Sequence, residues 1–205
     1  MTDTYYVLKS AVEFQFKEKG SHFLAYAFPV ETEEEAKQKL AELRKKYYNA
    51  THHCYAYTVG YPKAIIRQSD DGEPSGTAGL PIQNLIRARG IQNVLIAVVR
   101  YYGGIKLGTS GLIQAYKAAA AGVLNQAILQ AKYLKKKVLV KVPFENLNEV
   151  MKIAKKHKQQ PDWQTFLEDN YGKQQLTFQV RHSELPAFEI SLRNLPYVEV
   201  DIETI

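Results

Sequence analysis

Residues 94–111 read VLIAVVRYYGGIKLGTSG, and this stretch decides the fold of the N-terminal half of the chain. Its first six residues are apolar and mostly β-branched, which predicts a strand buried on both faces. The glycines that follow allow the backbone to come close to a ligand. An alanine-rich helix is expected next, at residues 112–129. Because free N–H groups at a helix start attract anions, this succession of strand, loop and helix predicts a phosphate site.

The predicted phosphate site combines glycines, hydroxyl groups and cations. Arg100, Lys106 and Lys117 are the expected cationic contacts. A plain tight turn is the alternative interpretation of the glycines. An ATPase loop of the Walker type is disfavoured, because lysine precedes Gly108 here and Thr109 follows it. The full set of candidate nucleic-acid or phosphate-binding residues is Arg100, Tyr101, Gly103, Gly104, Lys106, Gly108, Thr109, Ser110 and Lys117.

A second loop, residues 69–79, is rich in turn residues and carboxylates. Asp70, Asp71 and Glu73 could bind a divalent cation, or could act as acid and base together with His52. The alternative is that these carboxylates cap turns and the helix that follows. The four residues are therefore the catalytic candidates, and whether any of them holds a metal stays open.

Hydrophobic periodicity and turn residues predict two domains, spanning residues 1–134 and 135–205. The fold class is α+β. Lys135-Lys136-Lys137 is expected to be a solvated linker, after which the order βαββαβ predicts a ferredoxin-like C-terminal domain. The expected N-terminal elements are a hairpin at 11–30, helices at 33–48, 80–89 and 112–129, and strands at 52–59, 64–67 and 93–101. The expected C-terminal elements are strands at 138–142, 163–168, 175–181 and 197–202, and helices at 144–156 and 183–193.

Composition restricts the cellular context of the protein. The 205 residues are 45% hydrophobic and 23% charged, which is ordinary for a globular protein. We expect a cytoplasmic protein without membrane contact, because no apolar run approaches about 20 residues and no signal segment begins the chain. The single cysteine, Cys54, fits a reducing compartment and, in an apolar strand, is more often a core residue than a nucleophile. The net charge of +6 favours polyanionic partners, and no cofactor is expected.

The chain resembles the IMPACT family, and specifically its short bacterial members of the YigZ type. The resemblance rests on SDDGEPSGTAG at residues 69–79 and RYYGGIKLG at 100–108, together with His52-X-Cys54-Tyr-Ala-Tyr57. It implies an N-terminal α/β domain folded like domain IV of elongation factor G and a C-terminal domain like domain V of that factor. Eukaryotic members restrain a starvation-responsive arm of translation control through a separate N-terminal domain, for which we expect no room before residue 11.

These observations leave three functional hypotheses. The leading one is a translation-associated regulator that binds RNA or the ribosome through the glycine-rich basic loop, with Tyr101 as a stacking residue. The second is a metal-assisted hydrolase or phosphotransferase that uses Asp70, Asp71 and Glu73. The third is a protein-interaction adaptor with a partner in translation control. An enzyme is the less favoured class, and the oligomeric state is left open.

Overall fold

A computed structural model describes residues 3–168 and 172–204. The chain divides into two compact units, one formed by Tyr5–Lys132 and the other by the residues from Tyr133 onward together with Asp3 and Thr4. The division falls after Lys132, whereas we expected it after residue 134. Asp3 belongs to the second unit because its carboxylate accepts hydrogen bonds from that unit's side chains.

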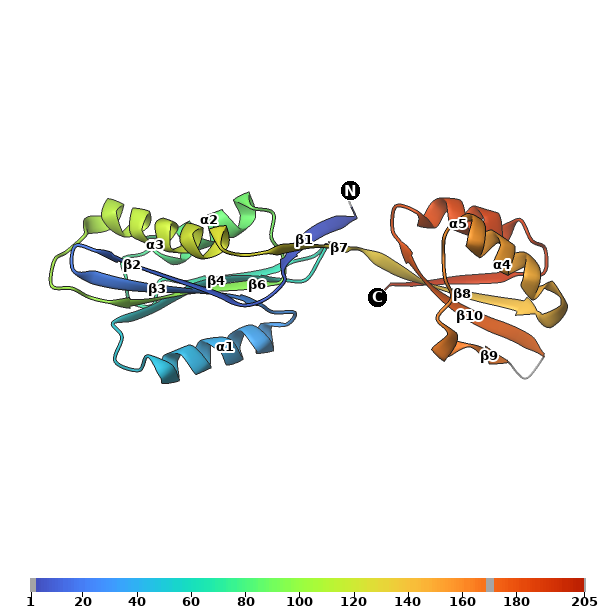
Figure 1. The fold of residues 1–205 in the computed structure, drawn as a ribbon, viewed down its shortest axis with the longest axis horizontal. Coiled ribbons are helices and arrows are strands. Elements are labelled where there is room, and N and C mark those ends of the chain that lie inside the picture. The colour runs from blue at the N-terminus through green and yellow to red at the C-terminus, as the bar shows by residue number, and fades with distance from the viewer. Residues whose placement is uncertain (1–2, 169–171, 205) are drawn as a thin grey trace. The chain divides into compact units, whose positions relative to one another are not determined.

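In the larger unit, helices cover both faces of an antiparallel five-stranded sheet of order β2-β3-β6-β4-β5 (Figure 1). Helix α1 lies on one face, and α2 and α3 lie on the other (Figure 1). A further two-stranded sheet pairs β1 with β7. The element bounds are β1 Thr4–Leu8, β2 Val12–Glu18, β3 Ser21–Pro29, α1 Glu33–Lys46, β4 His52–Val59, β5 Ile65–Ser69, α2 Gly79–Ala88, β6 Val94–Tyr101, α3 Gly108–Asn125 and β7 Leu129–Tyr133.

Strand β6 is the centre of this sheet, as its apolar sequence predicts. Alternate side chains of a strand point to opposite faces. Val94, Ile96 and Val98 pack in the core under α2 and α3, whereas Leu95, Ala97 and Val99 pack in the core under α1. All six are at most 1% exposed. One strand therefore serves two hydrophobic cores, which explains why it reads as a continuous apolar run.

Helix termini show where local sequence signals succeeded and where one was wrong. The N-cap expected at Thr32 is confirmed, because its hydroxyl accepts a hydrogen bond from the Glu35 amide at 3.1 Å. Helix α3 begins at Gly108 instead of residue 112, so the glycines at 108 and 111 lie in its first turn. It also ends at Asn125, and part of the tail that we assigned to this helix forms β7 instead.

The smaller unit has the predicted βαββαβ order, and its sheet order, β11-β8-β10-β9, is that of a ferredoxin-like fold. Two expectations were wrong in detail. Lys135–Lys137 begin strand β8 instead of a linker, and a 3₁₀ helix, Trp163–Thr165, replaces the first half of the strand expected at 163–168. The bounds are β8 Lys135–Pro143, α4 Leu147–Lys156, β9 Leu167–Glu168, β10 Lys173–Arg181, α5 Leu185–Arg193 and β11 Glu199–Thr204, with a second 3₁₀ helix at Phe144–Asn146.

Within residues 3–168 and 172–204, no helix combines the length and the apolar character needed to cross a bilayer.

The Asp3 carboxylate should make the smaller unit sensitive to acid. Hydrogen bonds from the Ser183 hydroxyl and the Arg181 guanidinium hold the pKa of this carboxyl well below its usual range. A lowered folded-state pKa stabilises the protein above the unfolded value of about 3.9, and this contribution is lost as the pH falls further. We expect Asp3→Asn to weaken the pH dependence of unfolding below about pH 4.

The fluorescence of Trp163, the single tryptophan, reports unfolding of the smaller unit directly. Asp201→Asn, which changes an exposed aspartate of the same unit, is the control and should keep the wild-type pH profile. If the Asp3 variant and the wild type had the same dependence of unfolding on pH, the acid sensitivity would not come from the Asp3 carboxylate.

Candidate functional site

The glycine loop after β6 is held by the two turns beside it. Gly103 packs so closely on the β2–β3 turn that a Cβ atom there would lie 1.8 Å from the carbonyl carbon of Gly20. The Gly103 amide donates to the Ser21 hydroxyl at 3.2 Å, and the Tyr102 amide donates to the Thr51 hydroxyl at 3.0 Å. The loop therefore starts from a fixed position, and a side chain at residue 103 would displace it.

Beyond this fixed point the candidate residues face solvent. Gly104, Lys106, Gly108, Thr109 and Ser110 are all exposed. No side chain caps the first turn of α3, so its amide groups lack an internal acceptor from a capping residue. Such a helix start has the partial positive charge that binds phosphate.

Two exposed lysines lie just before and within α3. Lys106 lies two residues before α3, and Lys117 lies in its third turn. Within the part of the chain that the structure describes, neither lysine has an ion-pair partner. Both ammonium groups are therefore available to an anion from outside the protein.

Arg100 does not belong to this exposed group, and the expectation that it contacts phosphate is corrected. Its side chain is 5% exposed, and Nη1 donates to Oε1 of Glu73 at 2.6 Å. Nη2 donates to the Ser21 hydroxyl at 3.1 Å. The guanidinium thus neutralises an internal carboxylate and cannot reach a ligand at the surface.

Glu73 is the centre of a buried polar cluster. Its Oε1 accepts from Arg100 and also from the Tyr116 hydroxyl at 2.7 Å. The Cys54 thiol lies 3.3 Å from that hydroxyl and 3.0 Å from the carbonyl oxygen of Asp70. Burial raises the pKa of both Cys54 and Tyr116, so the two groups stay protonated. A neutral thiol in this position is a packing group and a poor nucleophile.

The two neighbouring aspartates support the backbone of the carboxylate loop. Asp70 accepts hydrogen bonds from the amides of Gly76, Ala78 and Gly79 at 2.8–2.9 Å. Burial raises the pKa of Asp70, but these amide donors outweigh it and hold the pKa below its usual value. Asp71 is similarly engaged, because Arg44 and the His53 amide donate to it at 2.7 and 2.6 Å. Asp70 thus caps the turn and the start of α2, as the sequence-based alternative expects, whereas Asp71 joins the loop to β4 and to Arg44.

His52 lies beside this loop, as the catalytic hypothesis requires. Its Nδ1 is 2.8 Å from the carbonyl oxygen of Asp71, and its Nε2 is 3.8 Å from Oε1 of Glu73. The structure thus brings the four catalytic candidates together, but the three carboxylates already have protein partners. Among the described residues, no group of three or more His, Cys, Asp and Glu side chains is arranged to hold a metal.

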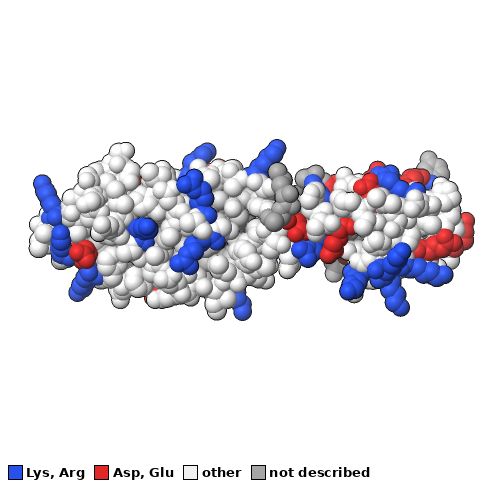
Figure 2. All heavy atoms as spheres, turned by 90° about the horizontal axis from the view of Figure 1, so that it is seen from above, with Lys and Arg blue, Asp and Glu red and all other residues white. Residues whose placement is uncertain are grey.

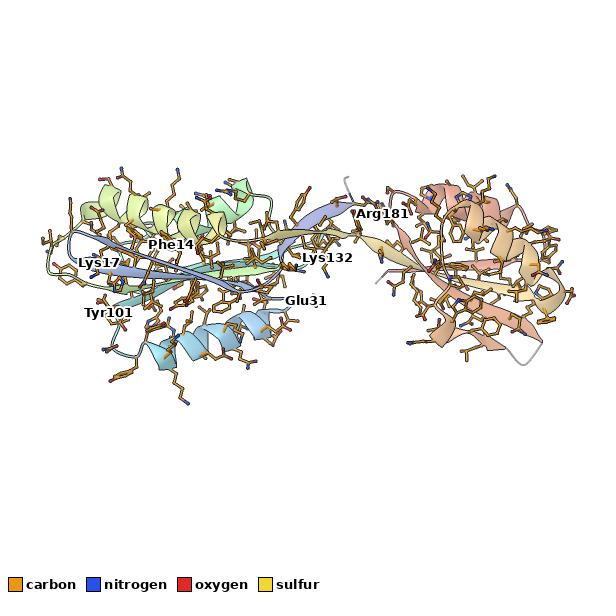
Figure 3. All side chains as sticks on the ribbon, in the orientation of Figure 1. Phe14, Lys17, Glu31, Tyr101, Lys132 and Arg181 are labelled. Carbon is orange, nitrogen blue, oxygen red and sulfur yellow. The ribbon has the colours of Figure 1, made fainter. Side chains whose placement is uncertain are left out.

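The two loop tyrosines differ in a way that the sequence did not reveal. Tyr101 packs against the core on the α1 side, and its hydroxyl donates to Asn49 at 3.0 Å (Figure 3). The ring of Tyr102 is 46% exposed and lies 5.6 Å from the Arg100 guanidinium. Tyr102 is therefore the ring that a base could stack on. Strand β6 ends at Tyr101, so Tyr102 already belongs to the exposed loop.

The face of the larger unit that carries α2 and α3 has more positive than negative side chains (Figure 2). Between Glu73 and Glu145 the sequence contains no aspartate or glutamate. Figure 2 shows Lys and Arg side chains spread over the part of the chain that carries α2 and α3, where Asp and Glu are sparse. An anionic partner would meet little repulsion there.

Comparison with known proteins shows which family the chain resembles. A family model described as the Impact N-terminal domain matches residues 19–124. Over 136 residues the chain is 38% identical to the IMPACT family member YvyE of Bacillus subtilis, covering 66% of this chain and 63% of that protein. Over 114 residues it is 40% identical to the IMPACT family member YigZ of Escherichia coli, covering 55% and 54%. The chain thus spans less than two thirds of the length of each relative.

Solved structures also resemble the chain along its full length. A crystal structure of a hypothetical protein has a TM-score of 0.69 and 25% identity, with coverage of 100% of this chain and 98% of that one. The two-domain α/β architecture is therefore shared along the full length.

Breaking the buried ion pair between Glu73 and Arg100 should lower the stability of the larger unit. We expect Glu73→Gln to destabilise the larger unit by about 3–5 kcal/mol, because the Arg100 charge then stays buried without a counter-ion. Hydrogen exchange of the β6 amides measures the loss locally. Glu18→Gln, at an exposed position of β2, is the matched control and should change stability by no more than about 0.5 kcal/mol. Equal exchange in both variants would contradict the role of the pair.

The backbone of Gly103 lies too close to that of Gly20 to leave room for a side chain. Gly103→Ala should destabilise the protein by about 1–3 kcal/mol, because the methyl group overlaps the backbone of Gly20. Gly111→Ala is the comparison, since the nearest neighbour of a methyl group there is the Leu107 side chain at 3.2 Å and alanine favours the helix. Thermal unfolding of the two variants should therefore shift to a lower temperature only for Gly103→Ala.

Proposed function

The chain belongs to the IMPACT family, and from this premise we propose that it acts in translation by binding RNA or the ribosome. The translational part of the proposal rests on the family resemblance, since eukaryotic members restrain a starvation-responsive arm of translation control. The proposal places the protein in the cytoplasm. We propose that the ligand-binding element is the exposed segment from Gly104 to the first turn of α3.

The observation that carries the proposal is the uncapped start of α3 with the unpaired Lys106 two residues before it; Lys117 adds a second unpaired cation in the third turn of the same helix. Amides of the first helical turn bind a phosphate through directed hydrogen bonds. Lys106 and Lys117 add charge without losing an internal partner, since neither forms an ion pair in the described part of the chain. Together these groups suit a polyanion, because phosphate contacts release condensed counter-ions.

Tyr102 gives the proposal a feature specific to nucleic acid. Its ring is 46% exposed, and its hydroxyl donates to the Gly104 carbonyl oxygen at 2.7 Å, which holds the ring against the loop. An aromatic ring fixed next to a phosphate site can stack on an unpaired base. We therefore propose Tyr102, in place of Tyr101, as the stacking residue.

The alternative hypothesis of a metal-assisted hydrolase has less support than RNA binding. Each of its carboxylates already accepts hydrogen bonds from the protein: Asp70 from three amides, Asp71 from Arg44, and Glu73 from Arg100 and Tyr116. Binding a cation would require these contacts to be exchanged. The carboxylates instead support the phosphate loop from inside.

Salt-dependent binding tests the proposal. We expect Lys106→Ala/Lys117→Ala to weaken binding to single-stranded RNA or to purified ribosomal subunits. The slope of log K against log salt should fall by about 0.7–0.9 for each lysine that contacts a phosphate. Fluorescence anisotropy at two salt concentrations measures both quantities. Arg100 is left intact, since its removal would unpair Glu73.

Lys37→Ala/Lys45→Ala is the matched control, because it removes the same charge from exposed positions of α1 on the opposite face of the sheet. It should bind like the wild type. Tyr102→Ala should weaken binding to single-stranded RNA more than to duplex RNA, since only unpaired bases stack. Binding that ignores salt, or an equal loss in both lysine pairs, would overturn the proposal.

A further inference from the structure

A surface groove runs between α2 and α3, and the phosphate loop does not account for it. The groove has a volume of about 480 Å³ and is lined mainly by Leu80, Pro81, Leu85, Ala88, Ile113 and Lys117. Leu80 and Ile113, which line the same groove from α2 and α3, are 44% and 41% exposed. The groove therefore presents apolar surface that the larger unit itself leaves open.

The spacing of the lining residues matches the helical period. On α2, Leu80, Asn84 and Ala88 follow one another at intervals of four residues and form one wall. On α3, Ile113 and Lys117 are also four residues apart and form the other wall. Two parallel rows of this kind accept the apolar stripe of a third helix, whose own side chains recur every three or four residues.

Three cations without carboxylate partners lie in the groove or next to residues that line it. Arg87 donates to the Asn84 side-chain oxygen at 3.2 Å, and Arg89 donates to that of Asn125 at 2.7 Å. Lys117 projects from α3, and no ion pair to it is found among the described residues. Residues 74–132 contain no aspartate or glutamate. A bound carboxylate would therefore meet no competing anion from α2 or α3.

We propose that this groove binds an acidic amphipathic helix of a partner protein. Apolar side chains of the partner occupy the space between Leu80 and Ile113, and its carboxylates face Arg87, Arg89 and Lys117. A protein fits this groove better than a nucleic acid, because no aromatic ring lines it and bases would find only Asn84 and Lys117 as polar groups. The site is distinct from the phosphate loop, because Lys117, which lines the groove, lies about 13 Å along α3 from the start of that helix.

A designed probe tests the proposal on the full chain. The probe is a labelled 18-residue helical peptide with leucine on one stripe and glutamate elsewhere, compared with a peptide in which every glutamate is lysine. We expect the acidic peptide to bind and the basic one not to bind. Leu80→Ala/Ile113→Ala should weaken binding of the acidic peptide about tenfold or more, because half-exposed apolar surface is lost from both walls.

Ile65→Ala/Ile128→Ala is the matched control, since both isoleucines are exposed but lie outside the groove. It should bind the acidic peptide like the wild type. Because Leu80 and Ile113 are exposed, their loss should leave the thermal unfolding temperature nearly unchanged. In methyl NMR spectra of the wild type, the acidic peptide should shift signals of Leu80, Leu85 and Ile113 and leave those of Ile65 and Ile128 in place.

The same variants separate this inference from the proposed RNA binding. Leu80→Ala/Ile113→Ala should bind RNA like the wild type, whereas Lys106→Ala alone should affect RNA and leave the acidic peptide unaffected. Equal binding of the acidic and basic peptides would overturn the inference, and so would unchanged peptide binding by the groove variant. If the groove variant instead lost RNA binding and kept peptide binding, the groove would be part of the nucleic-acid surface and the inference would also fail.

Discussion

The buried ion pair between Glu73 and Arg100 is the interaction on which the arrangement of the larger unit depends. It joins the carboxylate loop to the end of β6, and the Tyr116 hydroxyl attaches α3 to the same carboxylate. Ser21 extends the connection to the β2–β3 turn. Both ions lose hydration when they are buried, so the chief consequence of the pair is geometric: four chain segments can meet in one arrangement only.

Because of this ion pair, the residues that hold the loops in place differ from the groups that are exposed to a ligand. Residues that looked chemically active in the sequence hold the loops in place: Arg100 and Glu73 are buried against each other, and Asp70 and Asp71 bind backbone amides and Arg44. The surface that they support is formed by simpler groups: backbone amides, lysines and apolar side chains. Strong internal pairing explains the division, because a buried charge must be satisfied within the fold before any ligand arrives.

Two surfaces of different chemistry result on one side of the sheet. We propose the start of α3 for phosphate, and the groove between α2 and α3, which Leu80 and Ile113 line, for a partner helix. Lys117 lines the groove. A protein that works beside RNA and protein at once would use both surfaces, and the shared positive charge favours anionic partners at each.

The sequence by itself determined the family, the two-domain α/β architecture and most elements, because apolar periodicity, caps and glycine turns act over a few residues. Strand β6 and the Thr32 cap are examples. Only the tertiary structure decided which polar residues are free. The sequence shows that Arg100 is a cation, but its use depends on Glu73, a partner 27 positions away that folding brings to within 2.6 Å. Pairing across such distances leaves no local signal, so burial and partnership, which decide function, emerge only when the chain has folded.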